Sequence, residues 1–287
     1  MILRRQLFRK VTIVGVGLIG GSIGMAIKKN SVAHRVVGIS AHQASLDCAL
    51  KNEAIDEATM DVKKAVRDAD MVILCTPVNT ILKMIDEING AVRRGCIVTD
   101  VGSTKLAIVE RAQKIFPPHI LFVGSHPLAG SEKKGPAYAS AQLFENTTCV
   151  MTPTDKTNRL AKEKIKHFWT QLGAEVRMTP PDQHDRILSY VSHLPHLLAY
   201  GLMKSIPDEF LPYAAQGLRD TTRVAGSHPP MWSDICLSNS DNVLKSLDEA
   251  VKIFGQFRRA IVDGDDRVLT EIFQQAKEKR DRLGPNS

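Results

Sequence analysis

Two side chains beside glycine-rich turns are the best candidates for chemistry in the first half of this 287-residue chain. His126 lies in GSHPLAGSEKKG, directly after the apolar run 120–123, and Ser103 lies in DVGSTK, after another apolar run. Loops held by a rigid scaffold often carry function. We expect His126 to be catalytic, with a turn histidine as the alternative. Ser103 would face a nicotinamide or a substrate hydroxyl, and capping of the following helix is its alternative.

A second group of candidates lies further along the chain. His193 and His196, in SHLPH, are three residues apart on one predicted helix face, and Pro195 between them frees a backbone carbonyl and kinks the helix. That spacing could ligate a metal, but no cysteine or carboxylate partner is evident nearby, and we expect no metal. Arg223 precedes a Gly/Pro stretch and suits a bidentate grip on a carboxylate; a surface pair with Asp220 is the alternative.

The stretch GVGLIG fits the G-x-G-x-x-G pattern of dinucleotide-binding turns. It follows a predicted strand at 11–14 and opens a predicted helix, which is the context that gives the pattern its meaning. The first glycine permits the tight turn, the second lets the backbone approach a pyrophosphate, and the third lets helix and strand pack closely. A purely structural turn is the alternative. The predicted cofactor-binding residues are Gly15, Gly17, Leu18, Ile19 and Gly20.

The ends of the next two predicted strands bear on which cofactor binds. Strand 35–39 ends at Ser40, followed by Ala41 and His42, where NAD-binding sheets usually carry an acidic residue for the ribose hydroxyl. Without that carboxylate, a 2′-phosphate is not repelled. We predict NADP or NAD as cofactor, with NADP accepted and Ser40 and His42 near the phosphate. Thr76 and Pro77 close the following strand at the carboxyl edge, where ligands of such sheets bind.

The elements that position these residues follow from the apolar pattern. Short β-branched runs alternate with helical stretches up to residue 150, and a further helix at 155–172 and strand at 174–178 follow. This alternation predicts an α/β fold with a Rossmann-type, doubly wound, mostly parallel sheet covered on both faces. After Pro180-Pro181 apolar residues recur only at helical spacing. We predict a dinucleotide-binding domain at 1–180 and an all-helical domain at 181–287.

Composition and charge narrow the function classes. The chain is 43% hydrophobic and 24% charged, with net charge +7, but its basic residues are scattered among acidic ones, which favours a solvated surface over a nucleic-acid patch. Five isolated cysteines are typical of reduced thiols. Glycines interrupt the N-terminal apolar run, and no run approaches the ~20 residues of a membrane span. We expect a cytoplasmic protein without membrane or nucleic-acid partners.

Five motifs in order resemble those of the prephenate and arogenate dehydrogenase family of tyrosine biosynthesis: GVGLIGGS, DVGSTK, GSHPLAGSEKKG, SHLPH and TTRVAGSHPPMW. The resemblance implies a dinucleotide-binding domain followed by a helical domain that forms a homodimer. It also implies oxidative decarboxylation of prephenate to 4-hydroxyphenylpyruvate, or of arogenate to tyrosine, with hydride transfer to NAD(P). We favour prephenate as the substrate, with arogenate as the alternative.

The resemblance also assigns roles to residues. It implies that His126 bonds the ring 4-hydroxyl and takes its proton as hydride leaves C4, while Ser103 supports the same hydroxyl. His196 and Arg223 would bind substrate carboxylate, and His193 would either line the pocket or support it from behind. Glu132 would belong to an ionic network that gates the pocket.

Other functions compete with this interpretation. A dehydrogenase of 3-hydroxy acids would share the sheet, but such enzymes place a catalytic lysine on their helical domain and 182–199 offers no obvious candidate. A non-catalytic NAD(P)-sensing module would need the glycine loop but neither SHLPH nor Arg223. Nucleic-acid binding is the most distant alternative.

Overall fold

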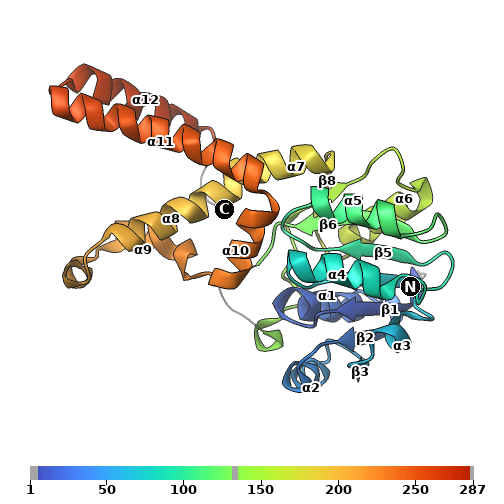
Figure 1. The fold of residues 1–287 in the computed structure, drawn as a ribbon. Helices are drawn as coiled ribbons and strands as arrows, with labels where there is room; N and C mark the ends of the chain where they lie inside the picture. The colour runs from blue at the N-terminus through green and yellow to red at the C-terminus, as the bar shows by residue number, and fades with distance from the viewer. Residues whose placement is uncertain (1–5, 131–134, 285–287) are drawn as a thin grey trace. The chain divides into compact units, whose positions relative to one another are not determined.

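The computed structural model describes residues 6–130 and 135–284. The chain forms two compact units, one up to Ser240 and one from Asp241 onward. The first unit contains the sheet and the helices up to α10, and the second contains most of α11 and all of α12 (Figure 1).

One eight-stranded sheet is the centre of the first unit, with the order β3-β2-β1-β4-β5-β6-β7-β8. Neighbouring strands are parallel, except that β6 and β7 are antiparallel. The order of the first six strands is that of doubly wound dinucleotide-binding sheets, so the predicted fold class is confirmed. The strands are β1 (Phe8–Val14), β2 (Ala33–Ile39), β3 (Glu57–Thr59), β4 (Met71–Leu74), β5 (Ile97–Asp100), β6 (Leu121–Pro127), β7 (Thr148–Thr152) and β8 (Glu175–Met178).

Helices cover both faces of this sheet, because successive side chains of each strand point to opposite sides. Ile13 and Ile73 belong to a core cluster that includes residues of α1 and α6. Val14 and Leu74 belong to a second cluster that includes residues of α4 and α5. The apolar pattern does not predict β3 and α3, which have three and five residues. The helices are α1 (Leu18–Lys29), α2 (Gln43–Lys51), α3 (Val62–Val66), α4 (Val78–Ile88), α5 (Leu106–Ile115) and α6 (Arg159–Gln171).

Strand β6 is longer than its apolar run suggests. The sequence predicts that His126 follows the strand, whereas β6 continues through His126 to Pro127. Beyond Val123, which pairs with Thr99 of β5, the strand pairs with β7 alone, and His126 lies opposite Val150. The prediction that His126 occupies a loop is therefore wrong. Its backbone is held by an antiparallel ladder, which positions the imidazole more rigidly than a turn would.

From Pro181 to Ser240, every element of the first unit is helical. A π-helical turn, Ser189–His193, separates α7 from α8, and Pro195 lies in the first turn of α8. Leu188, Ser189, His193 and Leu194 all have helical dihedral angles, so Pro195 lies within a continuous helical run, as the sequence predicts, and the π-helical turn directly before it accommodates its missing N–H. The elements are α7 (Pro181–Leu188), α8 (Leu194–Ser205), a 3₁₀ turn (Asp208–Tyr213), α9 (Gln216–Thr222), a 3₁₀ turn (Arg223–Gly226) and α10 (Pro229–Ser238).

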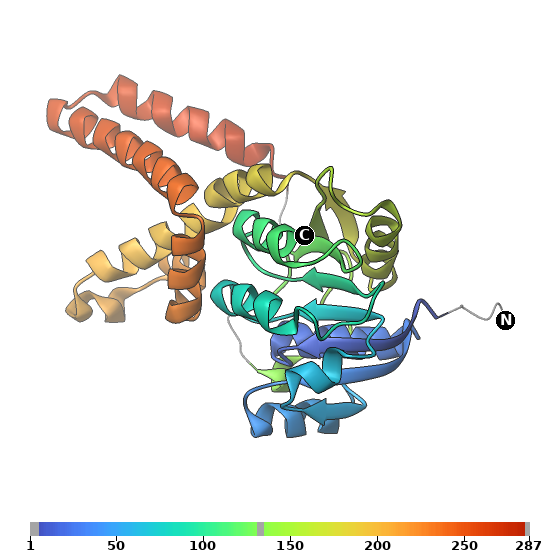
Figure 2. The same cartoon turned by 45° about the vertical axis from the view of Figure 1, so that its right-hand side comes forward.

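The second unit is a pair of helices, α11 (Ser240–Asp263) and α12 (Asp266–Asp281), which lie side by side (Figures 1 and 2). Asp265 caps α12 by accepting a hydrogen bond from the Val268 N–H at 3.0 Å. Phe257 and Phe273 stack between the helices with their ring centroids 5.5 Å apart. Within the described ranges, no helix is both long and apolar enough to cross a lipid bilayer.

Candidate active site

A cavity of about 440 Å³ lies at the carboxyl ends of the central strands. The loops after β1 and β4 both line it, at the point where the strand order reverses, which is where doubly wound sheets bind ligands. Five residues in and before α10 also line the cavity: Ser227, His228, Met231, Asp234 and Ile235. Among the predicted site residues, the cavity is lined by Gly17, Leu18, Ile19, Thr76, Pro77, Ser103 and His126.

The three motif glycines have different surroundings, and each fits a nucleotide-binding turn. Gly15 has φ +98°, and a Cβ there would lie 2.6 Å from the Cys75 carbonyl oxygen. A Cβ at Gly20 would lie 1.9 Å from the Gly15 carbonyl oxygen. A Cβ at Gly17 would meet nothing within 4 Å, so this backbone faces open space in the cavity. Gly17 also precedes α1, whose first turn carries no acidic residue to oppose a phosphate.

Three further cofactor candidates, Thr76, Ser40 and His42, differ in their position. Thr76 lines the cavity, and among the described residues its buried hydroxyl has no hydrogen-bond partner. An unpaired buried hydroxyl is costly, which favours a ligand partner at this point. Ser40 and His42 are not among the residues lining the cavity. They follow β2, and the Ser40 hydroxyl oxygen accepts a hydrogen bond from the His42 N–H at 3.1 Å.

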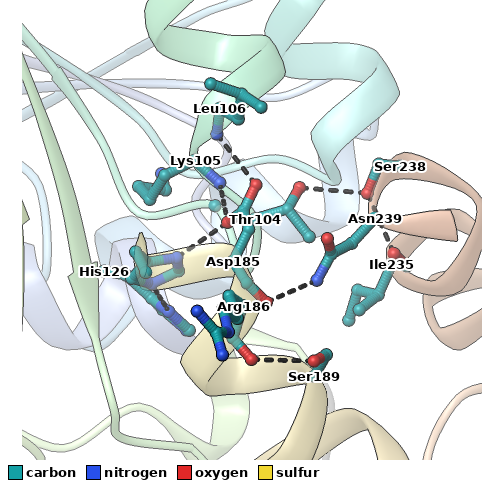
Figure 3. A network of polar contacts seen from close by, with 12 residues as sticks. Thr104, Lys105, Leu106, His126, Asp185, Arg186, Ser189, Ile235, Ser238 and Asn239 are labelled. Carbon is teal, nitrogen blue, oxygen red and sulfur yellow. Dashed lines mark hydrogen bonds and ion pairs between the residues drawn. The ribbon is translucent and has the colours of Figure 1, made fainter. Parts of the chain in front are cut away.

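His126 is connected to helix α7 by a chain of hydrogen bonds (Figure 3). Its Nδ1 lies 2.9 Å from Nε2 of His184, and Nδ1 of His184 lies 2.8 Å from Oδ1 of Asp185. The Asp185 carboxylate also accepts from the backbone N–H groups of Lys105 at 2.7 Å and Leu106 at 2.9 Å. Asp185 therefore caps α5 from 79 residues away, and Ser103 is not needed for that role.

A fully buried ion pair lies at the ends of β5 and β6. Lys105 Nζ contacts the Asp100 carboxylate, and neither side chain is exposed. The ammonium also donates to the Ser125 carbonyl at 3.0 Å, while Asp100 accepts from the backbone N–H of Gly102 at 2.8 Å. These additional hydrogen bonds offset part of the cost of burying both charges.

The surroundings of His126 determine its protonation. Burial lowers its pKa well below the ordinary value of 6.5, and the electrostatic effects of the nearby His184, Lys105 and His193 lower it further. Burial also lowers the pKa of His184, although the hydrogen bond to Asp185 opposes that effect. Both rings are therefore neutral at pH 7, and a neutral imidazole that lines a cavity can accept a proton.

Two of the predicted substrate-binding residues, His193 and His196, pack against Trp232. His196 stacks on its indole with ring centroids 3.5 Å apart, and His193 packs against it edge-on at 6.1 Å. The Nδ1–H of His196 donates to the Ser192 carbonyl at 2.9 Å. Burial lowers the pKa of His196, and the positive charge of the exposed Arg223 lowers it further.

His193, His196 and Arg223 are not among the residues that line the cavity. His193 is buried beside Asn239, whose Nδ2 lies 3.3 Å from its Nδ1, and burial lowers the pKa of His193 to about 4. Glu132 lies outside the described residues. Within the part of the chain that is described, no group of three His, Cys, Asp or Glu side chains could hold a metal ion.

The sequence interpretation did not single out several residues of this network: Lys105, His184, Asp185, Trp232 and Asn239. Adjacent His184 and Asp185, near the start of the first helix of the helical region, were a signal that could have been used. Their contact with His126 spans 58 residues and has no signature in local sequence.

Two family models match nearly the whole chain in sequence. Residues 23–178 match the model described as prephenate dehydrogenase, nucleotide-binding domain, and residues 180–275 match prephenate dehydrogenase, dimerization domain. This chain belongs to the prephenate dehydrogenase family. The resemblance seen in its motifs is thereby confirmed.

Relatives within the family match nearly the whole of this chain. A prephenate dehydrogenase of Bacillus subtilis is 37% identical over 285 residues, covering 97% of this chain and 77% of that protein. A cyclohexadienyl dehydrogenase of Zymomonas mobilis is 34% identical and covers 95% of each chain. The crystal structure of prephenate dehydrogenase from A. aeolicus, in complex with hydroxyphenyl propionate and NAD+, superposes with a TM-score of 0.89 at 31% identity, covering 96% of this chain and 98% of that one.

Proposed function

We propose that this chain is an NAD(P)-dependent prephenate dehydrogenase that converts prephenate to 4-hydroxyphenylpyruvate in tyrosine biosynthesis. The observation that carries the proposal is a neutral, cavity-lining His126 beside the glycine loop, in a chain of this family. Arogenate, which carries an ammonium where prephenate carries a keto group, is the alternative substrate. The cyclohexadienyl dehydrogenase relative keeps that alternative open.

The reaction asks little covalent chemistry of the protein. The bound nicotinamide accepts hydride from C4 of the substrate ring. His126 accepts the proton of the 4-hydroxyl as the hydride departs, which leaves a ring ketone. Loss of the ring carboxylate as CO2 then makes the ring aromatic, and the proton returns to the oxygen to give the phenol. Ser103, which also lines the cavity, supports the same hydroxyl.

The dinucleotide fits the residues around the glycine loop. The Gly17 backbone and the N-terminus of α1 would hold the pyrophosphate, and the Thr76 hydroxyl would gain the partner it lacks. Ser40 and His42 would lie near the adenosine ribose. His42 immediately precedes α2, whose first turn contains no acidic residue, so a 2′-phosphate meets a favourable helix end there. NADP is therefore accepted as well as NAD.

The substrate's side-chain carboxylate is bound by His196 and Arg223, and the buried His193 supports the pocket from behind, through its edge-on contact with Trp232. The electrostatic effect of Arg223 on His196 supports this assignment. Because Nδ1–H of His196 is committed to the Ser192 carbonyl, its Nε2 donates to a carboxylate only when the ring is protonated, and the arginine is the stronger anion partner.

The region from 181 to 287 forms the helical domain, and it makes a homodimer in the cytoplasm. Apolar side chains on α11 support this proposal, because Val251, Phe254, Ile261 and Val262 are all more than half exposed in the single chain. An exposed apolar surface of this kind is typical of a protein interface. The match to a dimerization domain over 180–275 agrees with it.

The test is absorbance at 340 nm with purified protein and each pairing of prephenate or arogenate with NAD or NADP. We expect the strongest signal with prephenate and a measurable rate with NADP. A strong signal with arogenate alone would show that the substrate is arogenate and not prephenate. Folded protein that binds cofactor but stays silent with all four pairings would overturn the proposal.

A further inference from the structure

The hydrogen bonds around Asp185 determine which ring nitrogen carries the proton in His184 and in His126. Both carboxylate oxygens already accept backbone N–H groups, Oδ1 from Lys105 and Oδ2 from Leu106. These donors, at the N-terminus of α5, favour the ionised carboxylate. An ionised carboxylate only accepts, so the Nδ1 of His184, 2.8 Å from Oδ1, must carry a proton.

The same argument extends to His126. A neutral His184 with its proton on Nδ1 has a bare Nε2, which can only accept. The Nδ1 of His126, 2.9 Å away, must then be the donor. The remaining ring nitrogen of His126, Nε2, keeps its lone pair, on a side chain that lines the cavity. Nε2 is therefore the atom that can take a proton from a ligand.

Burial and backbone contacts hold the hydrogen-bonded series His126–His184–Asp185 in place. His184 and Asp185 are buried, and the Asp185 carbonyl accepts a hydrogen bond from Asn239 Nδ2 at 2.7 Å. Asp185 thus connects α7, α5 and the end of α10 through its carboxylate and its carbonyl (Figure 3). The rigid Asp185 carboxylate favours one ring orientation and one tautomer of His184. Through its hydrogen bond, His184 in turn favours one ring orientation and one tautomer of His126.

We propose that His184 and Asp185 are a positioning pair that holds His126 as the tautomer protonated on Nδ1, and that shares the positive charge formed when its Nε2 accepts a proton. In that step, the substrate O–H bond breaks and an Nε2–H bond forms, while the Nδ1–H of His126 moves closer to the His184 acceptor. The negative Asp185 stabilises the charge across both rings. The identity of the hydroxyl rests on the proposed function, but the tautomer does not.

Two substitutions of His184 separate positioning from general structural support. In His184→Leu, the acceptor for Nδ1–H of His126 is lost, and we expect kcat to fall by about two orders of magnitude or more, the scale of general base catalysis, while KM for substrate and cofactor changes little. In His184→Gln, Oε1 can replace the lost acceptor, and we expect kcat within about tenfold of the unsubstituted enzyme. His167→Leu, at an exposed position on α6, is the control and should leave kcat unchanged. Equal kcat losses in the Leu and Gln variants, or a parallel rise in KM, would overturn the proposal.

The tautomer itself is measured without substrate. Long-range ¹H–¹⁵N NMR of protein labelled at histidine, with His126 assigned by its loss in His126→Asn, distinguishes a proton on Nδ1 from one on Nε2. We expect Nδ1–H in the unsubstituted protein and in His184→Gln, and a shift towards Nε2–H in His184→Leu. Nε2–H in the unsubstituted protein would refute the proposal, even if the enzyme is active. The expected tautomers in a protein that turns over neither substrate would support the pair and refute the reaction.

Discussion

The buried His193 makes the stability of this protein depend on pH in a way that can be calculated. Its Nδ1 faces the Nδ2 of Asn239, which also donates to the Asp185 carbonyl, so a proton on Nδ1 of His193 would place one donor against another. Burial and this geometry favour the neutral ring, and the pKa falls from 6.5 to about 4 on folding. The unfolded chain therefore binds a proton that the folded chain excludes throughout that interval.

The direction and size of the effect follow from linkage. Above pH 6.5, His193 does not lower the free energy of unfolding, because its ring is neutral in both the folded and the unfolded state. Below pH 6.5, the free energy of unfolding falls by about 1.4 kcal/mol per pH unit, until the folded-state pKa near 4 is reached. By pH 5 the loss from this one histidine is about 2 kcal/mol. That is a large part of a typical domain stability.

The assay is urea unfolding, followed by circular dichroism between pH 7.5 and 5, of the unsubstituted protein and His193→Asn. The asparagine Oδ1 can still accept from Asn239, but it does not titrate in this range. The variant is expected to be less stable at pH 7.5, because the site loses ring volume, and its deficit should shrink by about 2 kcal/mol at pH 5. His167→Asn, at an exposed position on α6, should leave the pH dependence as it is. A stability difference that stays constant from pH 7.5 to 5 would show that His193 is not held neutral by the fold.

Four further substitutions, one of them made on top of another, test the site. His126→Asn should lower kcat by about two orders of magnitude or more with substrate binding largely intact, and a near-normal kcat would remove His126 from the mechanism. Arg223→Ala should raise KM strongly by removing the carboxylate grip, and steady-state kinetics showing an unchanged KM would exclude that role. Lys105→Met leaves Asp100 buried without its cation and should cost about 3–5 kcal/mol in urea unfolding. Adding Asp100→Leu should recover most of that loss, and no recovery would contradict the pairing argument.

Much of the sheet could be predicted from the sequence, because its signals are local. A strand buried on both faces is an apolar run, and a turn that needs φ +98° at Gly15 favours glycine there. Shorter elements had no such signal. Strand β3 has three residues, one exposed and two half-buried, so no apolar run marks it. The end of β6 was also missed, because it depends on pairing with β7, whose residues lie 22 (Pro127 to Cys149) to 28 (Gly124 to Thr152) positions further along the chain, and not on its own composition.

The site divides in the same way. The sequence by itself determined the glycine loop, the cavity-lining His126 and Ser103, and the family, since these depend on residue types at short spacing. Only the tertiary structure decided that His184 and Asp185 bond to His126 and that Asp185 caps α5. The physical reason is that a hydrogen bond's direction and a group's desolvation depend on which distant side chains fold against it. The order of residues along the chain contains no direct information on the direction of such hydrogen bonds or on the desolvation of such groups.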